Sequence, residues 1–487
     1  MTTIRRRGFG LALLAILAVA SLLRFWQIAT RPGYDWDESV YSVIGANMAD
    51  HNLLQAKTEG GFAQQPYLYH PPIYFAVLGL WYRLFGTGIP EARVLAATGS
   101  LVMLLLLGLW LRKQVGDKWA LIATGVLALD GWTVFTNRVG WFENLMMPIG
   151  IVGLWLYWKA LKSPSLGRFI AAGGALGFVA VFKHVGIYFL IAALINWLIV
   201  RREHGKHLAL VGTAISTFAL YIGIMSITYG TTYWDESTVQ IQRILGMRES
   251  RGAVNSIGDI IAPLVSQYKI FAITVVMLAV GVVMVIVRVV QMVRRRSVAP
   301  IGSNTILFSW AASAVICFAG MKLILPHYLI MVIVPLYCYL ASEMQMRDAK
   351  MVTSDEKKRS SRRSFVLFGA GLALIAIGNV VAFSVRIVNS HDNALKATAV
   401  WARNHLPANA EIITEESVGA VIEQPYCKIA HAGKCHGATF MITYNSHTQQ
   451  PPRTHTVNEI LATAEKLKTF KGFKEDITIL RLAQPIK

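Results

Sequence analysis

The sequence is short of charge, and this shortage already limits what the protein is. Only 15% of its 487 residues are charged, 54% are hydrophobic, and the mean hydropathy is +0.48. Soluble domains of ordinary composition carry about 25% charged residues. A soluble protein is therefore excluded, and we expect a chain that crosses the cell membrane several times.

Acidic residues are scarcer than basic ones: 27 Asp and Glu stand against 47 Lys and Arg, a formal net charge of +20. An excess of this kind could indicate a nucleic-acid-binding protein. The basic residues, however, lie in short clusters between hydrophobic runs, which is the pattern that the positive-inside rule produces in membrane proteins. We therefore expect membrane lipid, and no nucleic acid, around this chain.

Cysteine is also rare, with four residues in the chain. Cys317 and Cys338 lie in apolar runs, where packing is their expected role. Cys427 and Cys435 lie close together in a polar C-terminal segment, and they are predicted to form a disulfide if that segment is outside the reducing cytoplasm. A metal site that uses His431 and His436 is the alternative.

The first hydrophobic run extends from Phe9 to about Ile28, after three arginines at residues 5–7. It is long for a signal peptide and no small-residue cleavage site ends it, so we interpret it as the first transmembrane helix, with a cytoplasmic N-terminus. Residues 30–92 then form a long external loop. Within it, residues 73–85 are too few to cross about 30 Å of hydrocarbon, and we expect an interfacial helix there.

Ten further hydrophobic runs bring the expected number of spans to eleven. They lie near residues 93–111, 119–136, 145–160, 168–183, 186–200, 208–228, 268–289, 304–321, 327–346 and 364–386. This assignment places all the strong basic clusters on the cytoplasmic side with the N-terminal arginines. Counting residues 73–85 as a full span would move Arg112/Lys113 and Arg201/Arg202 outside, which argues against it.

Two domains are expected. Residues 1–386 form an all-α polytopic membrane domain, and residues 387–487 form a small external C-terminal domain. Alternating apolar residues near 411–414 and 477–480, together with a helical pattern over residues 394–404, predict an α+β fold for the smaller domain.

An acidic cluster, Asp35-Trp36-Asp37-Glu38, follows the first span. One interpretation is a capping box, in which Asp35 and Glu38 satisfy the free backbone donors of a helix that begins near Trp36. Such a helix start does not need Asp37. The alternative is a functional site, because ionised side chains at a membrane edge are costly unless they are used.

Other polar groups converge on the same external side, in the connections at residues 137–143, 183–184 and 325–328 and in the loop at residues 229–267. Carboxylates that face an external cavity can conduct ions or act as a base in group transfer. Transporters carry ionisable residues near mid-span and show repeated halves. Here the charges lie at span ends and no repeat is visible, which favours chemistry.

Several short motifs, in this order and spacing, resemble those of the GT-C fold glycosyltransferases of the protein mannosyltransferase and aminoarabinose-lipid A transferase type, over roughly residues 10–200. They are Asp37-Glu38, His70-Pro71-Pro72, Leu84-Phe85-Gly86, Arg93-Val94-Leu95, Asn137-Arg138 with Glu143, and Phe182-Lys183, with weaker similarity at Pro326-His327-Tyr328. The resemblance implies a GT-C fold and a polyprenyl-phosphate sugar donor. It also implies transfer, with inversion at the anomeric carbon, to a hydroxyl of an external lipid, glycan or protein acceptor.

The resemblance also implies roles for individual residues. Asp37 would be the general base that takes the hydroxyl proton, and Glu38 would hold the site or the substrate. The lipid phosphate that leaves gains charge, so cations and polar groups are expected beside it. The residues implied for that phosphate are Arg138, Lys183, His327 and Tyr328, and the residues implied for an acceptor-side or structural position are His70, Glu143 and His184.

Each of these residues also has a simpler interpretation. Arg138 could pair with Glu143 across a turn, and Lys183 could extend to the interface. His70 could only lead into a helix, and His184 and His327 could be ordinary interfacial histidines. It is also open whether Glu143 contacts the acceptor, a divalent metal ion or neither. The rival functions are a lipid or ion transporter and a ligase that transfers a whole lipid-linked glycan.

Overall fold

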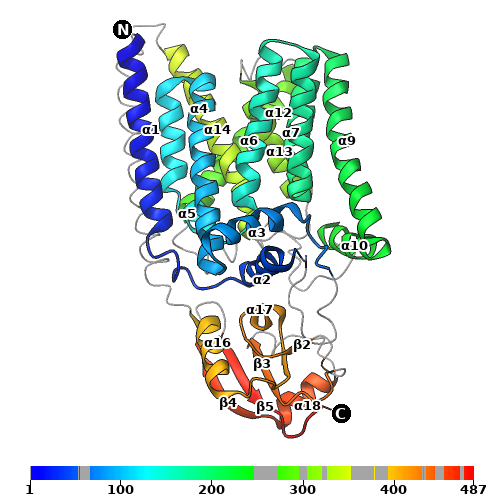
Figure 1. Ribbon diagram of the computed structural model, residues 1–487. Helices are drawn as coiled ribbons and strands as arrows, with labels where there is room; N and C mark the ends of the chain where they lie inside the picture. Colours follow the sequence, from blue (N-terminus) through cyan, green and yellow to red (C-terminus); the bar gives the residue numbers. More distant parts are fainter. Residues whose placement is uncertain are drawn as a thin grey trace.

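The structure is a computed structural model of the whole chain, shown in Figure 1. It describes residues 2–52, 66–245, 272–295, 304–320, 326–351, 393–429, 435–444, 455–471 and 476–486, together with residues 54, 378 and 432. The expected last span, residues 364–386, lies almost wholly outside this described part.

Long helices form a bundle in which the expected hydrophobic runs lie side by side (Figure 1). They are α1 (Thr2–Phe25), α4 (Ile89–Leu129), α6 (Glu143–Lys162), α7 (Leu166–Phe182), α8 (Ile187–Val200), α9 (His204–Tyr229), α12 (Ala272–Arg295), α13 (Thr305–Gly320) and α14 (Ile330–Met351). In the described part, five of these helices are long and apolar enough to cross a membrane (α1, α4, α9, α12 and α14), and α7, α8 and α13 are apolar but shorter. The all-α membrane fold class is thereby confirmed, while the total of eleven spans stays a prediction.

Helix α4 contains two of the expected spans. Gly116 interrupts it with φ 79° and ψ 172°, a backbone conformation that side chains rarely tolerate and glycine adopts readily. The chain turns there and runs back to Asp130, whose side chain caps the short helix α5 (Gly131–Thr136) by accepting from the backbone N–H of Thr133. The bend therefore lies in the basic connection that the charge pattern predicts at residues 112–118.

Two helices from the expected external loop lie crosswise to the bundle, at the end that faces the C-terminal unit (Figure 1). They are α2 (Trp36–His51) and α3 (Ile73–Phe85). They pack closely because Gly45 and Gly79 face the partner helix: a methyl group at Gly45 would come 2.6 Å from Cδ2 of Leu78. The short α3 thus has the bounds and the crosswise orientation expected of an interfacial helix.

The expected loop at residues 229–267 contains a helix in its described part, α10 (Thr231–Leu245). This helix also lies crosswise at the same end of the bundle (Figure 1). Its apolar residues Tyr233 and Trp234 stand beside Asp235 and Glu236. The sequence pattern is therefore that of a helix at an interface between apolar and polar surroundings.

In its described part, the C-terminal unit is a five-stranded sheet with three α-helices, so the expected α+β fold is confirmed. Its elements are α16 (Ala394–His405), β1 (Ile412–Thr414), α17 (Glu416–Gly419), β2 (Tyr426–Lys428), β3 (Phe440–Tyr444), α18 (His455–Thr463), β4 (Glu465–Phe470) and β5 (Ile477–Arg481). The strand order is β2-β1-β3-β5-β4. Strand β1 is parallel to both neighbours, and β5 is antiparallel to both of its own.

This unit contacts the membrane domain beside the acidic cluster. Helix α17 packs against α2, and Tyr34 packs against the core of the unit formed by residues such as Ile412 and Ile442. Cys427 and Cys435 are joined by a disulfide. His431, which the alternative metal site would need, lies outside the described residues.

Candidate active site

Helix α2 begins with a capping box, so the structural interpretation of Asp35 and Glu38 is confirmed. Asp35 has the extended conformation of an N-cap residue and its carboxylate accepts from the backbone N–H of Asp37, at 3.2 Å. The backbone N–H of Asp35 in turn donates to Oε1 of Glu38, at 2.8 Å. The cap uses the side chains of Asp35 and Glu38, and the Asp37 side chain is not part of it.

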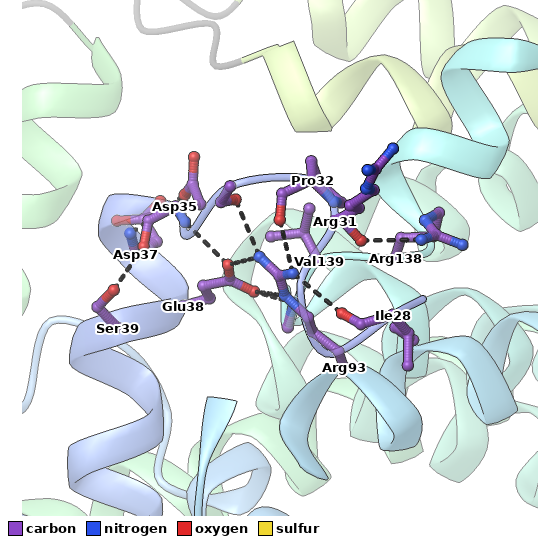
Figure 2. Close-up of polar contacts among 12 residues, drawn as sticks. Ile28, Arg31, Pro32, Asp35, Asp37, Glu38, Ser39, Arg93, Arg138 and Val139 are labelled. Atoms are coloured by element: carbon purple, nitrogen blue, oxygen red, sulfur yellow. Dashed lines mark hydrogen bonds and ion pairs between the residues drawn. The ribbon is translucent and has the colours of Figure 1, made fainter. Parts of the chain in front are cut away.

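Glu38 also forms a buried ion pair with Arg93 of α4 (Figure 2). Nε of Arg93 donates to Oε2 of Glu38 at 2.9 Å, and Nη2 donates to Oε1. The backbone N–H of Gly140 donates to Oε2 at 3.0 Å. Both side chains are fully buried. Since Glu38 accepts from α2, α4 and the connection before α6, its geometry is that of a positioning residue.

Arg93 holds the chain that leads into α2. Its guanidinium donates to three backbone carbonyls of the segment between α1 and α2 (Figure 2). These are the carbonyls of Ile28, at 3.1 Å, Pro32, at 2.7 Å, and Gly33, at 2.9 Å. A single arginine thus joins the end of the first span, the acidic cluster and α4.

Asp37 lies on the first turn of α2 and is half-buried. Its carboxylate interacts electrostatically with the phenol of Tyr41, one turn further along, and with the ammonium of Lys183. The Tyr41 hydroxyl lies 3.3 Å from Nε2 of His70, and the His70 ring lies 5.0 Å from that of Phe142. The structure therefore brings Asp37, His70 and Lys183 together, from three separate segments.

Lys183, Glu143 and His327 form a second polar cluster beside Asp37. Nζ of Lys183 pairs with Oε1 of Glu143, and Nε2 of His327 lies 3.7 Å from the same oxygen. The ammonium also lies 4.8 Å from the ring centre of Tyr328. All four side chains are buried. Two predictions are therefore wrong. Glu143 pairs with Lys183 and not with Arg138, and Lys183 is buried and does not extend to the membrane interface.

Glu143 has one oxygen that the cluster does not use. Its Oε2 is buried and, within the described part of the chain, accepts no hydrogen bond. A buried acceptor without a partner carries a desolvation cost. This oxygen is therefore available to a hydroxyl of a bound molecule.

Arg138 lies elsewhere, and its contacts favour a structural role. Its guanidinium donates to four carbonyls at and after the end of α1: Leu23 at 2.7 Å, Arg24 at 3.0 Å, Trp26 at 2.6 Å and Arg31 at 2.8 Å. The last carbonyls of a helix lack partners within the helix, and a cation there also complements the helix dipole. These contacts place the Arg138 guanidinium at the end of α1 and argue against a role at the donor phosphate.

His184 follows Lys183 but its ring packs against Phe218 and Tyr221 of α9. Burial, and then the nearby Lys183 ammonium, lowers the pKa of His184 to about 4. The ring is therefore neutral near pH 7. A neutral, ring-packed histidine fits a structural role.

Two residues that shape the connection before α6, Arg24 and Asn144, were not predicted from the sequence. Arg24, fully buried in α1, donates to Oδ1 of Asn137, whose Nδ2 donates to Asn144 at 2.6 Å. Nε1 of Trp141 donates to the Asp35 carboxylate at 3.1 Å. Arg24 is a lone arginine within the first apolar run, and this position could have indicated a buried partner, since charges inside a span usually have one.

A divalent metal does not fit the described residues. No three His, Cys, Asp or Glu side chains come together there in a way that could hold an ion. Glu38 and Glu143 are each paired with a buried cation, and the Asp35 carboxylate caps α2. We therefore derive no step through a metal ion.

The fold and part of the sequence match known glycosyltransferases. Residues 69–229 match the family model described as dolichyl-phosphate-mannose-protein mannosyltransferase. By sequence, the chain matches none of the curated proteins.

Among solved structures, the fold is similar to ArnT from Cupriavidus metallidurans bound to undecaprenyl phosphate, with a TM-score of 0.64, 14% identity, and coverage of 96% of this chain and 97% of that one. It is also similar to the archaeal oligosaccharyltransferase AglB from Archaeoglobus fulgidus in complex with an inhibitory peptide and a dolichol-phosphate. There the TM-score is 0.57, the identity 12%, and the coverage 91% of this chain and 70% of that one. The resemblance expected from the motifs is thereby confirmed, and the chain is a membrane protein of the GT-C glycosyltransferase fold.

Proposed function

We propose that the protein transfers a sugar from a polyprenyl-phosphate donor to a hydroxyl of a lipid, glycan or protein acceptor. The observation that carries this proposal is the half-buried Asp37 carboxylate, which the α2 cap does not use and which interacts with the buried ammonium of Lys183. Transfer of a sugar from a lipid phosphate to a hydroxyl needs a base for the hydroxyl proton and a cation for the leaving phosphate, close to each other.

In the proposed reaction, Asp37 takes the proton of the acceptor hydroxyl. The acceptor oxygen then forms a bond to the anomeric carbon, on the face opposite the phosphate. The bond between this carbon and the phosphate oxygen breaks, and polyprenyl phosphate leaves with the electron pair. Displacement from the opposite face inverts the anomeric configuration.

Lys183 supplies the positive charge for the leaving phosphate. Its pair with Glu143 holds the ammonium in a buried position, where electrostatic stabilisation is stronger than in water. His327 and Tyr328, which contact the pair, complete this side of the site. The free oxygen of Glu143 and the ring of His70 lie on the acceptor side in this proposal, and Glu38 positions α2.

We further propose that the site lies on the external face of the cell membrane, with the N-terminus in the cytoplasm. The strong basic clusters lie at the other ends of the predicted spans, which supports this orientation. Cysteines placed at Thr231 and Lys428, in a background without the native cysteines, should react with a membrane-impermeant thiol reagent in intact cells. Cysteines at Lys357 and Arg362 should react only after the membrane is opened, and labelling of these from outside would overturn the orientation.

The activity is tested with purified protein in detergent, without any ion gradient. A polyprenyl-phosphate monosaccharide with a labelled sugar should be consumed when acceptor lipids, glycans or glycoproteins from the host cell are added, and free polyprenyl phosphate should accumulate. A transporter would consume none. A ligase would instead require a lipid-linked oligosaccharide, which is offered in a parallel reaction.

Lys183→Met supplies the matched variant for this assay. It should abolish most turnover, whereas Lys162→Met, at the end of α6 away from Glu143, should leave turnover unchanged. Equal turnover of both variants would remove Lys183 from the proposed site. Mass spectra of lipids and glycoproteins from a deletion strain would then identify the sugar and the acceptor.

A further inference from the structure

A surface cavity of about 650 Å³ lies far from the candidate active site, where α4 bends and α6 ends. It is lined by Leu109, Arg112, Lys113, Asp117, Trp155 and Trp158. Trp155 follows Glu143 by twelve residues on α6, or about 18 Å along a helix. The cavity therefore shares no residue with the proposed reaction.

The cavity is basic. Arg112 and Lys113 lie in its wall, and Nζ of Lys159 lies 5.3 Å from the ring centre of Trp155. Asp117 is the acidic residue of the wall, and it pairs with Arg112 at 2.8 Å. In the described part of the chain no carboxylate pairs with Lys113 or Lys159. The excess positive charge indicates an anionic occupant.

Trp155, which lines the wall, also has a hydrogen-bond donor without an acceptor. Nε1 of Trp155 is buried and has no hydrogen-bond partner among the described residues. Buried N–H groups of this kind almost always find a partner, in the protein or in a bound molecule. An oxygen of an anionic group in the cavity would provide one.

Two apolar strips lead along the helix surfaces into the cavity. On α4 the exposed side chains Val102, Leu105 and Leu109 recur at spacings of three and four residues, which places them on one face, and Lys113 continues that face. On the neighbouring α6, Val152 is exposed and is followed at the same spacings by Trp155 and Lys159. Each strip therefore runs from the hydrophobic surface of the bundle to a lysine.

We propose that this cavity binds the headgroup of an anionic glycerophospholipid, with one acyl chain along each strip. The phosphate would contact Lys113 and Lys159 and accept from Trp155. Basic pockets between transmembrane helices are suited to such headgroups, and tryptophan favours the depth at which headgroups lie. Two strips match the two chains of a phospholipid better than the single chain of a polyprenyl phosphate.

The test uses native mass spectrometry of the delipidated full-length protein in detergent. Dioleoylphosphatidylglycerol should bind about tenfold or more tightly than dioleoylphosphatidylcholine, which has the same chains without net charge. Lys113→Gln with Lys159→Gln should weaken phosphatidylglycerol binding roughly 30-fold, because each basic residue at an anionic surface contributes roughly fivefold. Trp155→Phe keeps the apolar wall and should weaken binding several-fold.

The matched control is Arg201→Gln with Arg202→Gln, which removes two exposed charges from the end of α8 and should leave binding unchanged. Equal affinity for the two lipids would overturn the proposal, as would equal losses in the two double variants. Displacement of phosphatidylglycerol by inorganic phosphate would indicate a site for a free anion, and stronger binding of undecaprenyl phosphate would indicate a prenyl site. Either result would also overturn it.

Discussion

The side chains of Glu38 and Arg93 form a fully buried, bidentate ion pair, although the two residues are 55 positions apart in the chain. The same glutamate completes the cap of α2, and the same arginine holds the segment after α1. This pair therefore sets where α2 begins and, with it, where the neighbouring Asp37 carboxylate lies.

Breaking this pair should cost stability. Glu38→Gln leaves the buried Arg93 charge without its partner, a change that typically costs about 3–5 kcal/mol. The thermal unfolding of purified protein should shift strongly downward. Asp117→Asn is the control, because it breaks a partly exposed pair with Arg112 and should cost less than about 1 kcal/mol. Similar effects of Glu38→Gln and Asp117→Asn would contradict the assigned role.

Asp37→Asn should remove the general base without altering the shape of α2. Loss of such a base typically lowers turnover about 10²- to 10⁴-fold. Asp35→Asn should cost little, because asparagine caps a helix about as well as aspartate and keeps an oxygen for Trp141. The measurement is turnover of the two variants at matched expression. Near-normal turnover of Asp37→Asn would remove Asp37 from the proposed mechanism.

Substitutions of Arg138 and Lys183 should have different effects, because Arg138 has a structural role and Lys183 a functional one. Arg138→Lys loses most of the four carbonyl contacts that end α1, and hydrogen bonds from a charged group are worth about 1.5–3 kcal/mol each. The unfolding temperature should therefore fall, while the KM for the donor lipid changes little in the protein that remains folded. Lys183→Met should instead lower kcat or raise the donor KM. A large rise in donor KM for Arg138→Lys at unchanged unfolding temperature would return Arg138 to the phosphate site.

His184 should make the protein less stable in mild acid. The pKa of its imidazole is lowered from the usual 6.5 to about 4 by burial and by Lys183, so the unfolded chain binds the proton more readily. The contribution of neutral His184 to the free energy of unfolding is complete above pH 6.5 and is lost as the pH falls toward 4. His184→Gln does not titrate, so the unfolding temperature of the wild type should fall more steeply across this window. Parallel curves for the two proteins would exclude His184 as the cause.

Much of the fold could be predicted because its signals are local. The hydrophobic runs up to residue 346 correspond to α1, α4, α6–α9 and α12–α14, since a span must keep apolar residues over its whole length. The 13 residues of α3 were too few for a span, and the capping box was readable from the spacing of Asp35 and Glu38. The sequence pattern did not predict α10, because this helix mixes polar and apolar residues and contains no long apolar run.

The sequence by itself thus determined the membrane class, the order of the spans and the acidic cluster. Only the tertiary structure decided which charges meet. Glu143 pairs with Lys183, 40 residues away, and Arg138 caps α1 more than a hundred residues before it. The physical reason is that a buried charge needs a partner in space. Which residue provides that partner depends on how the helices pack, and the local spacing of residues along the chain does not contain that information.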